Sequence, residues 1–471
     1  GSVIVGLLAA VIAWFGGTTG FYLAVIYGAL WVAAPAIAWL VSRSAELEDQ
    51  ITVTETDREK LRRVARRTWL YFETFVTAEH NLLPPDNFQE TPYPVEASRT
   101  SPTNIGMYLL STVSARDFGW ISLGEAADRV AGTLDTVDKL DKHRGHLYNW
   151  YETKSLHPLL PRYISSVDSG NLAGHLIAVA SAFAEWAEAP AAYLQGDLDG
   201  ILDTLGVFDM ALSALPDDRR QIRPVRQRLV ERTTGMRRAV LSIKSEPETA
   251  AIRTLNLAVN AGEILKLARA LNEETGTTGS EVLVTWATRL QSVCEAHIAD
   301  AHFEESRLKA LRERLSEISR RARTIAFQMD FSFLLRQDRK LLSIGYRADD
   351  RQLDESCYDL LASEARLASL FAIAKGDVPT EHWFRLGRPI AEIGFKGALI
   401  SWSGSMFEYL MPPLVMNEPA GSILDQTSRQ IIRRQIAYGR SKGIPWGVSE
   451  AAYNARDREM TYQYTNFGVP G

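Results

Sequence analysis

Apolar side chains recur at helical spacing along much of the chain. Residues 57–76 place them three or four positions apart, which predicts an amphipathic helix with Thr56 as its N-cap. The apolar positions of this helix are Leu61, Val64, Ala65, Trp69, Phe72 and Phe75. The same periodicity predicts further helices over residues 105–115, 123–140, 172–186, 359–374 and 424–438.

Strand-like runs are few and short. Residues 331–335 and 340–346 flank a polar turn at residues 336–339, which predicts a hairpin of two short strands. Because helical patterns account for most of the remaining chain, the predicted fold class is mainly α.

The N-terminal region is apolar, and no charged residue precedes Arg43. It divides into two apolar pieces, residues 3–15 and 21–41, and the second has the length of about 20 residues that a bilayer requires. A secretory signal would begin with a basic region, which is missing here. We therefore predict a transmembrane region over residues 1–42, with one or two transmembrane helices.

A basic cluster follows this apolar region. By the positive-inside tendency it predicts that the rest of the chain lies in the cytoplasm. The cluster consists of Arg58, Lys60, Arg62, Arg63, Arg66 and Arg67. Residues 43–103 are interpreted as a juxtamembrane helix and a linker, with many prolines between residues 84 and 102.

Residues 104–471 are interpreted as one large domain that includes a charged helical segment at about 197–326. Solvated helix faces explain these charges best, because glutamates neutralise the arginines locally; binding of phosphate or anionic lipid is the weaker alternative. Both ends of the sequence look like cuts through a longer polypeptide.

Composition narrows the possible functions. The 471 residues are 46% hydrophobic, which is enough to bury a core, and the net charge of −5 argues against nucleic acid as a partner. Two cysteines and the lack of any Asn-x-Ser/Thr acceptor do not fit a secreted, disulfide-bonded protein. Phosphate-loop, dinucleotide and His-Glu-x-x-His motifs are missing and the eight histidines are scattered, so no cofactor or metal is predicted.

Glu364 is the first candidate catalytic residue. It stands near the start of the most apolar predicted helix outside the N-terminal region, where partial burial is expected to raise its pKa, as suits a general acid. The alternative is that Glu364 only pairs with a neighbouring arginine or a backbone amide, as most buried glutamates do.

Two further segments combine carboxylates with aromatic residues. Residues 402–410 place Glu408 beside Trp402 and small residues that permit close backbone approach. Residues 442–450 are expected to form a loop that carries Glu450. Aromatic and polar residues lie close to Glu450 in the sequence, namely Trp446, Tyr453, Asn454 and Arg456.

An upstream loop offers more polar and aromatic groups. Residues 146–151 include Trp150 and Tyr151, and Asp168 precedes a predicted helix, where Asp168 or Ser169 could instead be a helix cap. Two carboxylates from separate elements, together with aromatic platforms, are what the cleavage of a glycosidic bond requires. The residues alone therefore make glycosidase-like chemistry plausible.

Four of these segments together resemble cyclic β-1,2-glucan synthases, namely residues 146–171, 358–366, 402–410 and 446–457. The resemblance covers nearly the whole chain, including the apolar start. It implies an (α/α)6 toroid that continues beyond the position of Gly471 and is therefore truncated at its C-terminal end, preceded by membrane helices. The toroid would be a glucoamylase-like catalytic domain located at the bacterial inner membrane.

The resemblance also implies an activity, the cyclisation of linear β-1,2-glucan by intramolecular transglycosylation. Carried over residue by residue, Glu364 looks like the general acid/base and Glu450 like the nucleophile, with Glu408 as the reserve candidate. A β-linked chain that closes into a β-linked ring needs two inversions, which indicates a retaining route. The implied partners are a β-1,2-glucan chain, the membrane and other domains of the same synthase. The expected substrate-binding residues are Trp150, Tyr151, Asp168, Arg366, Trp402, Glu408, Trp446, Tyr453 and Arg456.

Two other functions remain open from the sequence. An endo-β-1,2-glucanase would use the same site with water as the acceptor. A membrane-anchored scaffold or glycan-binding module would hold the glycan without cutting it.

Overall fold

The computed structural model describes residues 2–15, 18–41, 53–216, 222–245, 250–301, 305–393, 396–449, 451–458, 460–465 and 468–469. The chain divides into two compact units. The first contains Gly1–Thr52 and Pro419–Gln426, and the second contains Val53–Glu418 and Thr427–Gly471.

The first unit contains two apolar helices, α1 (Ser2–Phe15) and α2 (Thr18–Val41), which pack against each other. At about 1.5 Å per residue, α1 is too short for a hydrocarbon core of about 30 Å. Among the residues that the structure describes, no helix combines the length and the apolar character needed to cross a membrane. The predicted transmembrane helices are therefore not supported by the structure.

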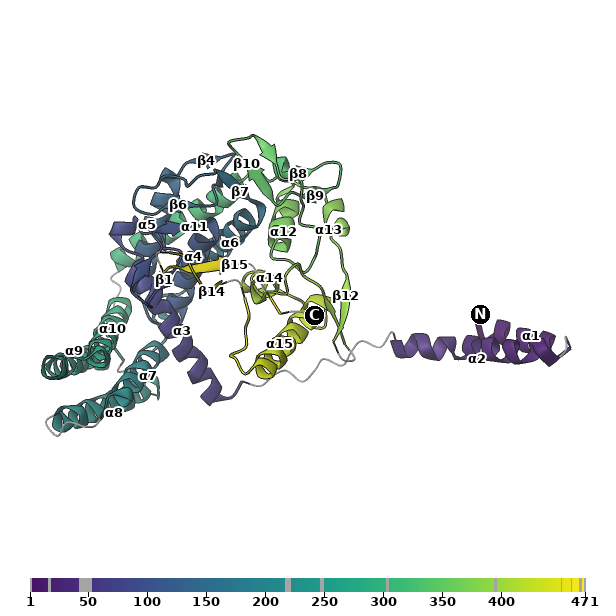
Figure 1. Ribbon diagram of the computed structural model, residues 1–471. Helices are drawn as coiled ribbons and strands as arrows, with labels where there is room; N and C mark the ends of the chain where they lie inside the picture. The colour runs from purple at the N-terminus through teal and green to yellow at the C-terminus, as the bar shows by residue number, and fades with distance from the viewer. Residues whose placement is uncertain are drawn as a thin grey trace. The chain divides into compact units, whose positions relative to one another are not determined.

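The second unit is built on a mainly helical body (Figure 1). Its helices are α3 (Glu55–Phe75), α4 (Pro102–Asp117), α5 (Leu123–Lys139), α6 (Ser166–Glu188), α11 (Glu305–Gln328) and α12 (Arg366–Lys375). Helix α6 packs against α4, α11 and α12, and the buried apolar side chains of these elements form one continuous core. Tyr108, Leu134 and Phe183 lie in this core. Helix α6 is thus a central element of the body.

Helices α6 and α11 lie antiparallel to each other. The hydroxyl of Ser319 donates to the carbonyl of Ala180 at 2.6 Å, and Arg312 donates to the carbonyl of Ala189 at 2.7 Å. Higher residue numbers on α11 thus meet lower numbers on α6. The start of α11 therefore lies next to the end of α6, although more than a hundred residues separate them in the sequence.

Those intervening residues form a helical arm with a core of its own, seen in teal in Figure 1. The arm contains α7 (Asp199–Ala214), α8 (Arg223–Ser245), α9 (Ala250–Thr275) and α10 (Thr278–Ala301). It contacts the body through α3 and α5. Part of this junction is the buried pair Arg66–Glu73 on α3, at 2.9 Å, with Arg66 also donating to Thr204 on α7.

The strands of the second unit are short and antiparallel. One sheet has three strands, in the order β11 (Gln352–Leu353), β10 (Gly345–Arg347) and β7 (Tyr163–Ser165). The others are pairs: β1 (Phe88–Gln89) with β2 (Val95–Glu96), β3 (Arg99–Thr100) with β6 (Tyr151–Glu152), β4 (Lys142–His143) with β5 (His146–Leu147), β8 (Leu335–Arg336) with β9 (Leu341–Leu342), β12 (Ile390–Ile393) with β13 (Lys396–Leu399), and β14 (Ala451–Arg456) with β15 (Tyr462–Thr465).

Three further helices lie in the C-terminal part of the chain. They are α13 (Glu381–Arg385), α14 (Met406–Leu410) and α15 (Ile423–Lys442), of which α15 belongs to the second unit from Thr427 onward. Single 3-10 turns occur at Ala78–His80, Ala191–Leu194, Ser332–Leu334 and Pro412–Leu414.

The helical pattern of the sequence is confirmed for most elements, with two corrections. The N-cap of α3 is Thr54, whose hydroxyl accepts from the amide of Asp57, and Thr56 lies inside the helix. The helix predicted over residues 359–374 begins only at Arg366. Residues before it are held by non-local bonds, since Leu361 donates to the carbonyl of Gly387 and the hydroxyl of Ser363 accepts from Ala365. These bonds compete with helix formation.

Candidate functional site

Asp168 is the centre of a buried hydrogen-bond cluster in the first turn of α6. The hydroxyl of Thr103 donates to its carboxylate at 2.6 Å. Asn149, with its amide nitrogen turned toward the carboxylate, donates to Asp168 at 2.9 Å, and its oxygen accepts from the indole of Trp150 at 3.2 Å. Burial raises the pKa of the Asp168 carboxyl, and the donated hydrogen bonds oppose that rise. The structure thus brings together two of the predicted site residues, Asp168 and Trp150.

This cluster continues to the surface through Arg99. Its guanidinium lies over the ring of Trp150, 4.9 Å from the ring centroid, and forms an ion pair with Asp86 at 3.0 Å. Asp86 also accepts from the side chain of Asn104 at 3.1 Å. We call residues 86–104 together with Asn149, Trp150 and Asp168 the N-terminal cluster. Residues 84–102, interpreted from the sequence as part of a linker, therefore contribute side chains to this cluster.

The N-terminal cluster borders a cavity of about 1040 Å³. One side is lined by the β1–β2 hairpin and the other by residues of the β14–β15 hairpin. Its lining combines charged groups with aromatic rings, namely Asp86, Arg99 and Asp457 with Phe88, Tyr462 and Tyr464. Aromatic faces beside carboxylates and a guanidinium suit a sugar chain, which presents flat apolar faces and hydroxyl groups. We call this space the interhairpin cavity.

Two side chains of the predicted upstream loop have structural contacts instead. Tyr151 is fully buried; its hydroxyl donates to the carbonyl of Asp141 at 2.5 Å and accepts from the amide of Tyr148 at 2.8 Å. The N-cap of α6 is Ser165, so neither Asp168 nor Ser169 caps the helix. Ser169 bonds instead to the buried imidazole of His146 at 2.9 Å.

Glu364 lies in a turn two residues before α12 and is partly exposed. Helix α12 packs closely on α6, since a Cβ on Gly170 would lie 2.3 Å from the Cβ of Ala368. Any side chain at position 170 would push the helices apart. This contact sets the N-terminal turn of α12, which follows Glu364, beside the first turn of α6, which carries Asp168.

Arg366 is a buried anchor, with 2% of its surface exposed. Its guanidinium pairs with Glu418 at 2.6 Å and donates to the carbonyl of Tyr409 at 3.2 Å. Burial lowers the pKa of the guanidinium, and the Glu418 carboxylate opposes this shift. These contacts tie α12 to α14.

Glu408 is also largely buried, with 7% exposure, and its carboxylate accepts from the amide of Ser403 at 3.0 Å. It therefore fixes the turn after Trp402. Trp402 itself is 50% exposed, lies 6.1 Å from the ring of Tyr358 and lines a separate cavity of about 310 Å³. An exposed indole on a fixed turn is available as a platform for a sugar.

Glu450, the expected nucleophile, lies outside the described residues. The residues before it are well fixed: the side-chain oxygen of Gln435 accepts from the amide of Val448 at 2.7 Å. Trp446 is 52% exposed and packs on Gly439 of α15. We call residues 358–418 together with 427–465 the C-terminal cluster.

Residues 451–456, which follow the expected loop, form strand β14. Tyr453 lies on this strand, and the structure does not describe its side chain. Arg456 lies over the ring of Tyr462, 4.3 Å from the centroid, and donates to its hydroxyl. The predicted residues 446–456 therefore belong to the approach and first strand of a hairpin.

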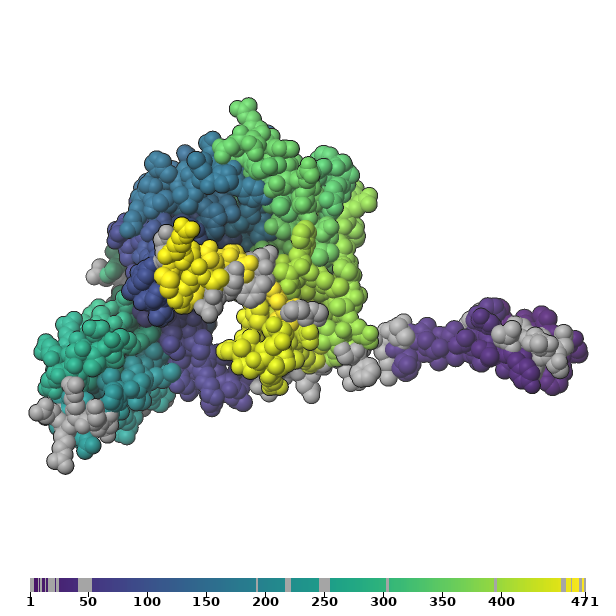
Figure 2. All heavy atoms as spheres, viewed as in Figure 1, coloured from purple at the N-terminus to yellow at the C-terminus, as the bar shows by residue number. Residues whose placement is uncertain are grey.

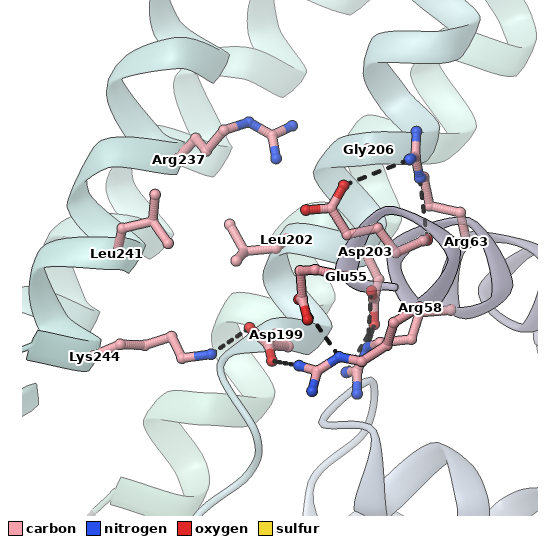
Figure 3. Close-up of a pocket in the computed structure, with 12 residues that line it drawn as sticks. Glu55, Arg58, Arg63, Asp199, Leu202, Asp203, Gly206, Arg237, Leu241 and Lys244 are labelled. Carbon is pink, nitrogen blue, oxygen red and sulfur yellow. Dashed lines mark hydrogen bonds and ion pairs between the residues drawn. The ribbon is translucent and has the colours of Figure 1, made fainter. Parts of the chain in front are cut away.

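A cavity of about 390 Å³ between α3, α7 and α8 is shown in Figure 3. Its charged side chains pair with one another, as Arg58 does with Asp199 at 3.1 Å and Lys244 with the same carboxylate at 2.5 Å. The lining residues include no aromatic ring. These contacts hold the arm to α3, and the cavity lacks the groups that would suit a sugar.

No metal site is evident in the part of the chain that the structure describes, because no group of three or more His, Cys, Asp or Glu side chains is arranged to hold an ion.

The sequence reasoning missed four side chains that organise the site. These are Gln89, Arg99, Glu418 and Gln435. Their partners lie elsewhere in the sequence, up to 373 positions away for Gln89 and Tyr462. The local sequence pointed to only one part of this site: the Pro-rich segment contains two charged residues, Asp86 and Arg99, and the aromatic residue Phe88.

Comparison with known proteins adds direct evidence on family. No family model matches the chain. The chain is 61% identical over 444 residues to the cyclic β-(1,2)-glucan synthase NdvB of Rhizobium meliloti strain 1021, an alignment that covers 94% of this chain. The chain is homologous to one segment of a cyclic β-1,2-glucan synthase. It spans 16% of the length of that relative. The resemblance seen in the motifs is confirmed by this match.

Solved structures resemble the chain more distantly. A glucoamylase-like protein of Bacteroides caccae aligns with a TM-score of 0.47 and 11% identity, covering 87% of this chain and 75% of that one. An endo-β-1,2-glucanase from Chitinophaga pinensis aligns with a TM-score of 0.43 and 10% identity, covering 88% and 75%. Scores below 0.5 do not establish a common fold.

Proposed function

We propose that this chain cyclises linear β-1,2-glucan by intramolecular transglycosylation as one part of a longer synthase. The observation that carries the proposal is the 61% identity to a cyclic β-(1,2)-glucan synthase over 94% of the chain. The interhairpin cavity supports it, because its aromatic and charged lining suits a glucan chain. The other domains of the synthase are then the partners of this chain.

The proposed mechanism uses Glu364 as the general acid/base and Glu450 as the nucleophile. Glu364 protonates the leaving oxygen while Glu450 attacks the anomeric carbon, giving a glycosyl-enzyme ester with inverted configuration. The 2-hydroxyl at the non-reducing end of the same chain then attacks this carbon, its proton passes to Glu364, and the ester bond breaks. Two inversions leave a β-bond in the ring.

The side chains of the N-terminal cluster have binding roles in this proposal. Arg99 lines the cavity and its guanidinium lies over the ring of Trp150, and Asp168 holds the loop of Trp150 through Asn149. Trp402, Trp446, Tyr453 and Arg456 are proposed sugar contacts on the opposite elements. Arg366 and Glu408 support the site from beneath through their buried contacts.

The finer architecture belongs to the same proposal. We propose that the paired helices of the body form part of an (α/α)6 toroid, in keeping with the packing of α6 on α4, α11 and α12. A position at the cytoplasmic face of a bacterial inner membrane stays a prediction from the sequence alone.

The test is product analysis by mass spectrometry after incubation with linear β-1,2-glucan. We expect rings, which weigh one water less than linear chains of equal length, and a loss of about 100-fold or more in turnover for Glu364→Gln and for Glu450→Gln. The matched control is Glu355→Gln, an exposed carboxylate near Glu364 in the sequence, which should retain parent activity. Linear fragments alone would indicate an endo-glucanase, and unchanged glucan would contradict catalysis by this chain.

A further inference from the structure

The side-chain amides of two glutamines bind the backbone at Val448, before the β14–β15 hairpin, and at the turn of this hairpin. Before Glu450, Gln435 of α15 bonds to both backbone groups of Val448: its oxygen accepts from the amide at 2.7 Å and its nitrogen donates to the carbonyl at 3.1 Å. The same nitrogen lies 3.4 Å from the carbonyl of Gly404. Gln435 is 1% exposed, so these bonds are protected from water.

The second glutamine, Gln89, lies on strand β1 and holds the far end of the β14–β15 hairpin. Its side-chain oxygen accepts from the amide of Tyr462 at 2.9 Å, and its nitrogen donates to the carbonyl of Met460 at 3.3 Å. Both bonds lie at or near the surface. Because water competes for such groups, they break more easily than those of Gln435.

The two hairpins are otherwise separate structures. Among the described residues, β1 pairs with β2, and β14 pairs with β15, each in a sheet of two strands. A side chain rather than a strand ladder therefore bridges them. Figure 2 shows the β14–β15 hairpin in yellow lying against the blue part of the chain, over which it reaches.

The hairpin is organised as a unit that could move without losing its own structure. Asp457 fixes its turn, since its carboxylate accepts from the amide of Thr461 at 2.8 Å and from the side chain of Gln463 at 3.1 Å. These bonds are internal to the hairpin. Release of Gln89 would leave the hairpin intact but detached from β1.

We propose that the β14–β15 hairpin is a cover of the interhairpin cavity, with Gln435 at its fixed end and Gln89 as a releasable catch. The inference rests on the proposed function and deepens it. Opening admits a glucan chain between the hairpins, and closing excludes water while the glycosyl-enzyme ester exists. The catch then determines the acceptor: the sugar 2-hydroxyl when the cover is closed, and water when it is open.

Gln89 is on this account a positioning residue, because it acts on the reaction through the hairpin that follows Glu450. In both outcomes the bond between the anomeric carbon and Glu450 breaks and the proton of the acceptor passes to Glu364. A sugar hydroxyl gives a ring, and water gives a linear chain. Loss of the catch should therefore shift products from rings to linear chains.

The first measurement is hydrogen exchange of the amides of residues 451–465 in the full chain. In Gln89→Ala the amide of Tyr462 loses its acceptor, and we expect exchange of the hairpin to become about five-fold faster, the factor that corresponds to one ordinary hydrogen bond. Gln89→Glu keeps an acceptor but loses the donor, so a smaller increase is expected. The control is Arg458→Ala, an exposed change in the same turn that does not line the cavity. Equal exchange in Gln89→Ala and the parent would overturn the catch.

The second measurement is the ratio of ring to linear products from linear β-1,2-glucan. We expect this ratio to fall about five-fold in Gln89→Ala, again the equivalent of one hydrogen bond, and to stay at the parent value in Arg458→Ala. A lower rate with an unchanged ratio would show that Gln89 only stabilises the fold. If the parent chain gives no turnover, the proposed function and the acceptor role are both rejected, while the exchange data still decide whether Gln89 holds the hairpin.

Discussion

The N-terminal and C-terminal clusters are held together in different ways. In the N-terminal cluster, side chains bond mainly to other side chains, as in Asp168 with Thr103 and Asp86 with Arg99. In the C-terminal cluster, side chains bond mainly to backbone groups, as Gln435 does with Val448 and Glu408 with Ser403. The first arrangement fixes the orientation of functional groups, and the second fixes the path of the chain. A surface of fixed side chains thus faces a segment whose backbone is positioned by separate anchors.

The largest expected effect is on the buried anchor of the C-terminal cluster. Arg366→Ala leaves the carboxylate of Glu418 largely buried without its guanidinium, and we expect the free energy of unfolding to fall by about 3–5 kcal/mol. Urea unfolding measures this change. The control is Arg339→Ala, whose exposed pair with Asp359 at 3.9 Å should contribute at most about 1 kcal/mol. Equal losses in the two variants would show that the anchor is not specific to Arg366.

The next effect concerns the buried imidazole of His175, which lies on α6 one turn after Asn171. Burial lowers the pKa of His175 from 6.5 to about 4. As the pH falls, the unfolded chain therefore binds this proton before the folded chain does. The folded state loses stability between pH 6.5 and about 4, by up to about 3 kcal/mol at 1.36 kcal/mol per pKa unit, and is unaffected by this group above pH 6.5.

Unfolding by urea at several pH values tests this expectation. His175→Leu removes the imidazole, so the unfolding free energy should change less steeply with pH, by up to the contribution of one bound proton. His146 and His297, whose pKa values burial also lowers to about 4, keep their contributions in this variant. The control is His157→Leu, the same substitution at an exposed position. Parallel curves for parent and His175→Leu would contradict the prediction.

The smallest expected effect sharpens the comparison within the N-terminal cluster. Thr103→Val removes the hydroxyl that donates to Asp168 but keeps the shape, and we expect a loss of about 1.5–2 kcal/mol in unfolding free energy. Thr112→Val is the matched control, since its buried hydroxyl donates to the carbonyl of Tyr108 within its own helix. The expected change there is below about 0.5 kcal/mol. A larger loss in Thr112→Val would argue against the importance of the Asp168 cluster.

The secondary structure could be predicted where it depends on residues that are close together in the sequence. The helices α3, α4, α5, α6 and α15 follow from the spacing of their apolar residues, and the β8–β9 hairpin follows from its polar turn. Residues 359–365 read as helical, but bonds to Gly387 and the hydroxyl of Ser363 hold them in a turn. In that case a distant partner overrode local propensity.

The sequence predicted which types of residue the candidate site contains, but not how these residues contact one another. Asp168 and Trp150 are joined in one cluster through Asn149, whereas Tyr151 is buried in the core. The residues after Glu450 form a strand whose far end is held by Gln89. No pattern in the local sequence encodes a bond between residues that lie hundreds of positions apart.

The antiparallel pair of α6 and α11 has a consequence for how the chain tolerates changes in the arm. Because the end of α6 and the start of α11 are neighbours, a short connection could join them, and the arm interrupts this helix pair only in the sequence. Since the arm has a hydrophobic core of its own, its length and surface can change while the body keeps its packing. We therefore expect changes in length to be tolerated better in the arm than in the body.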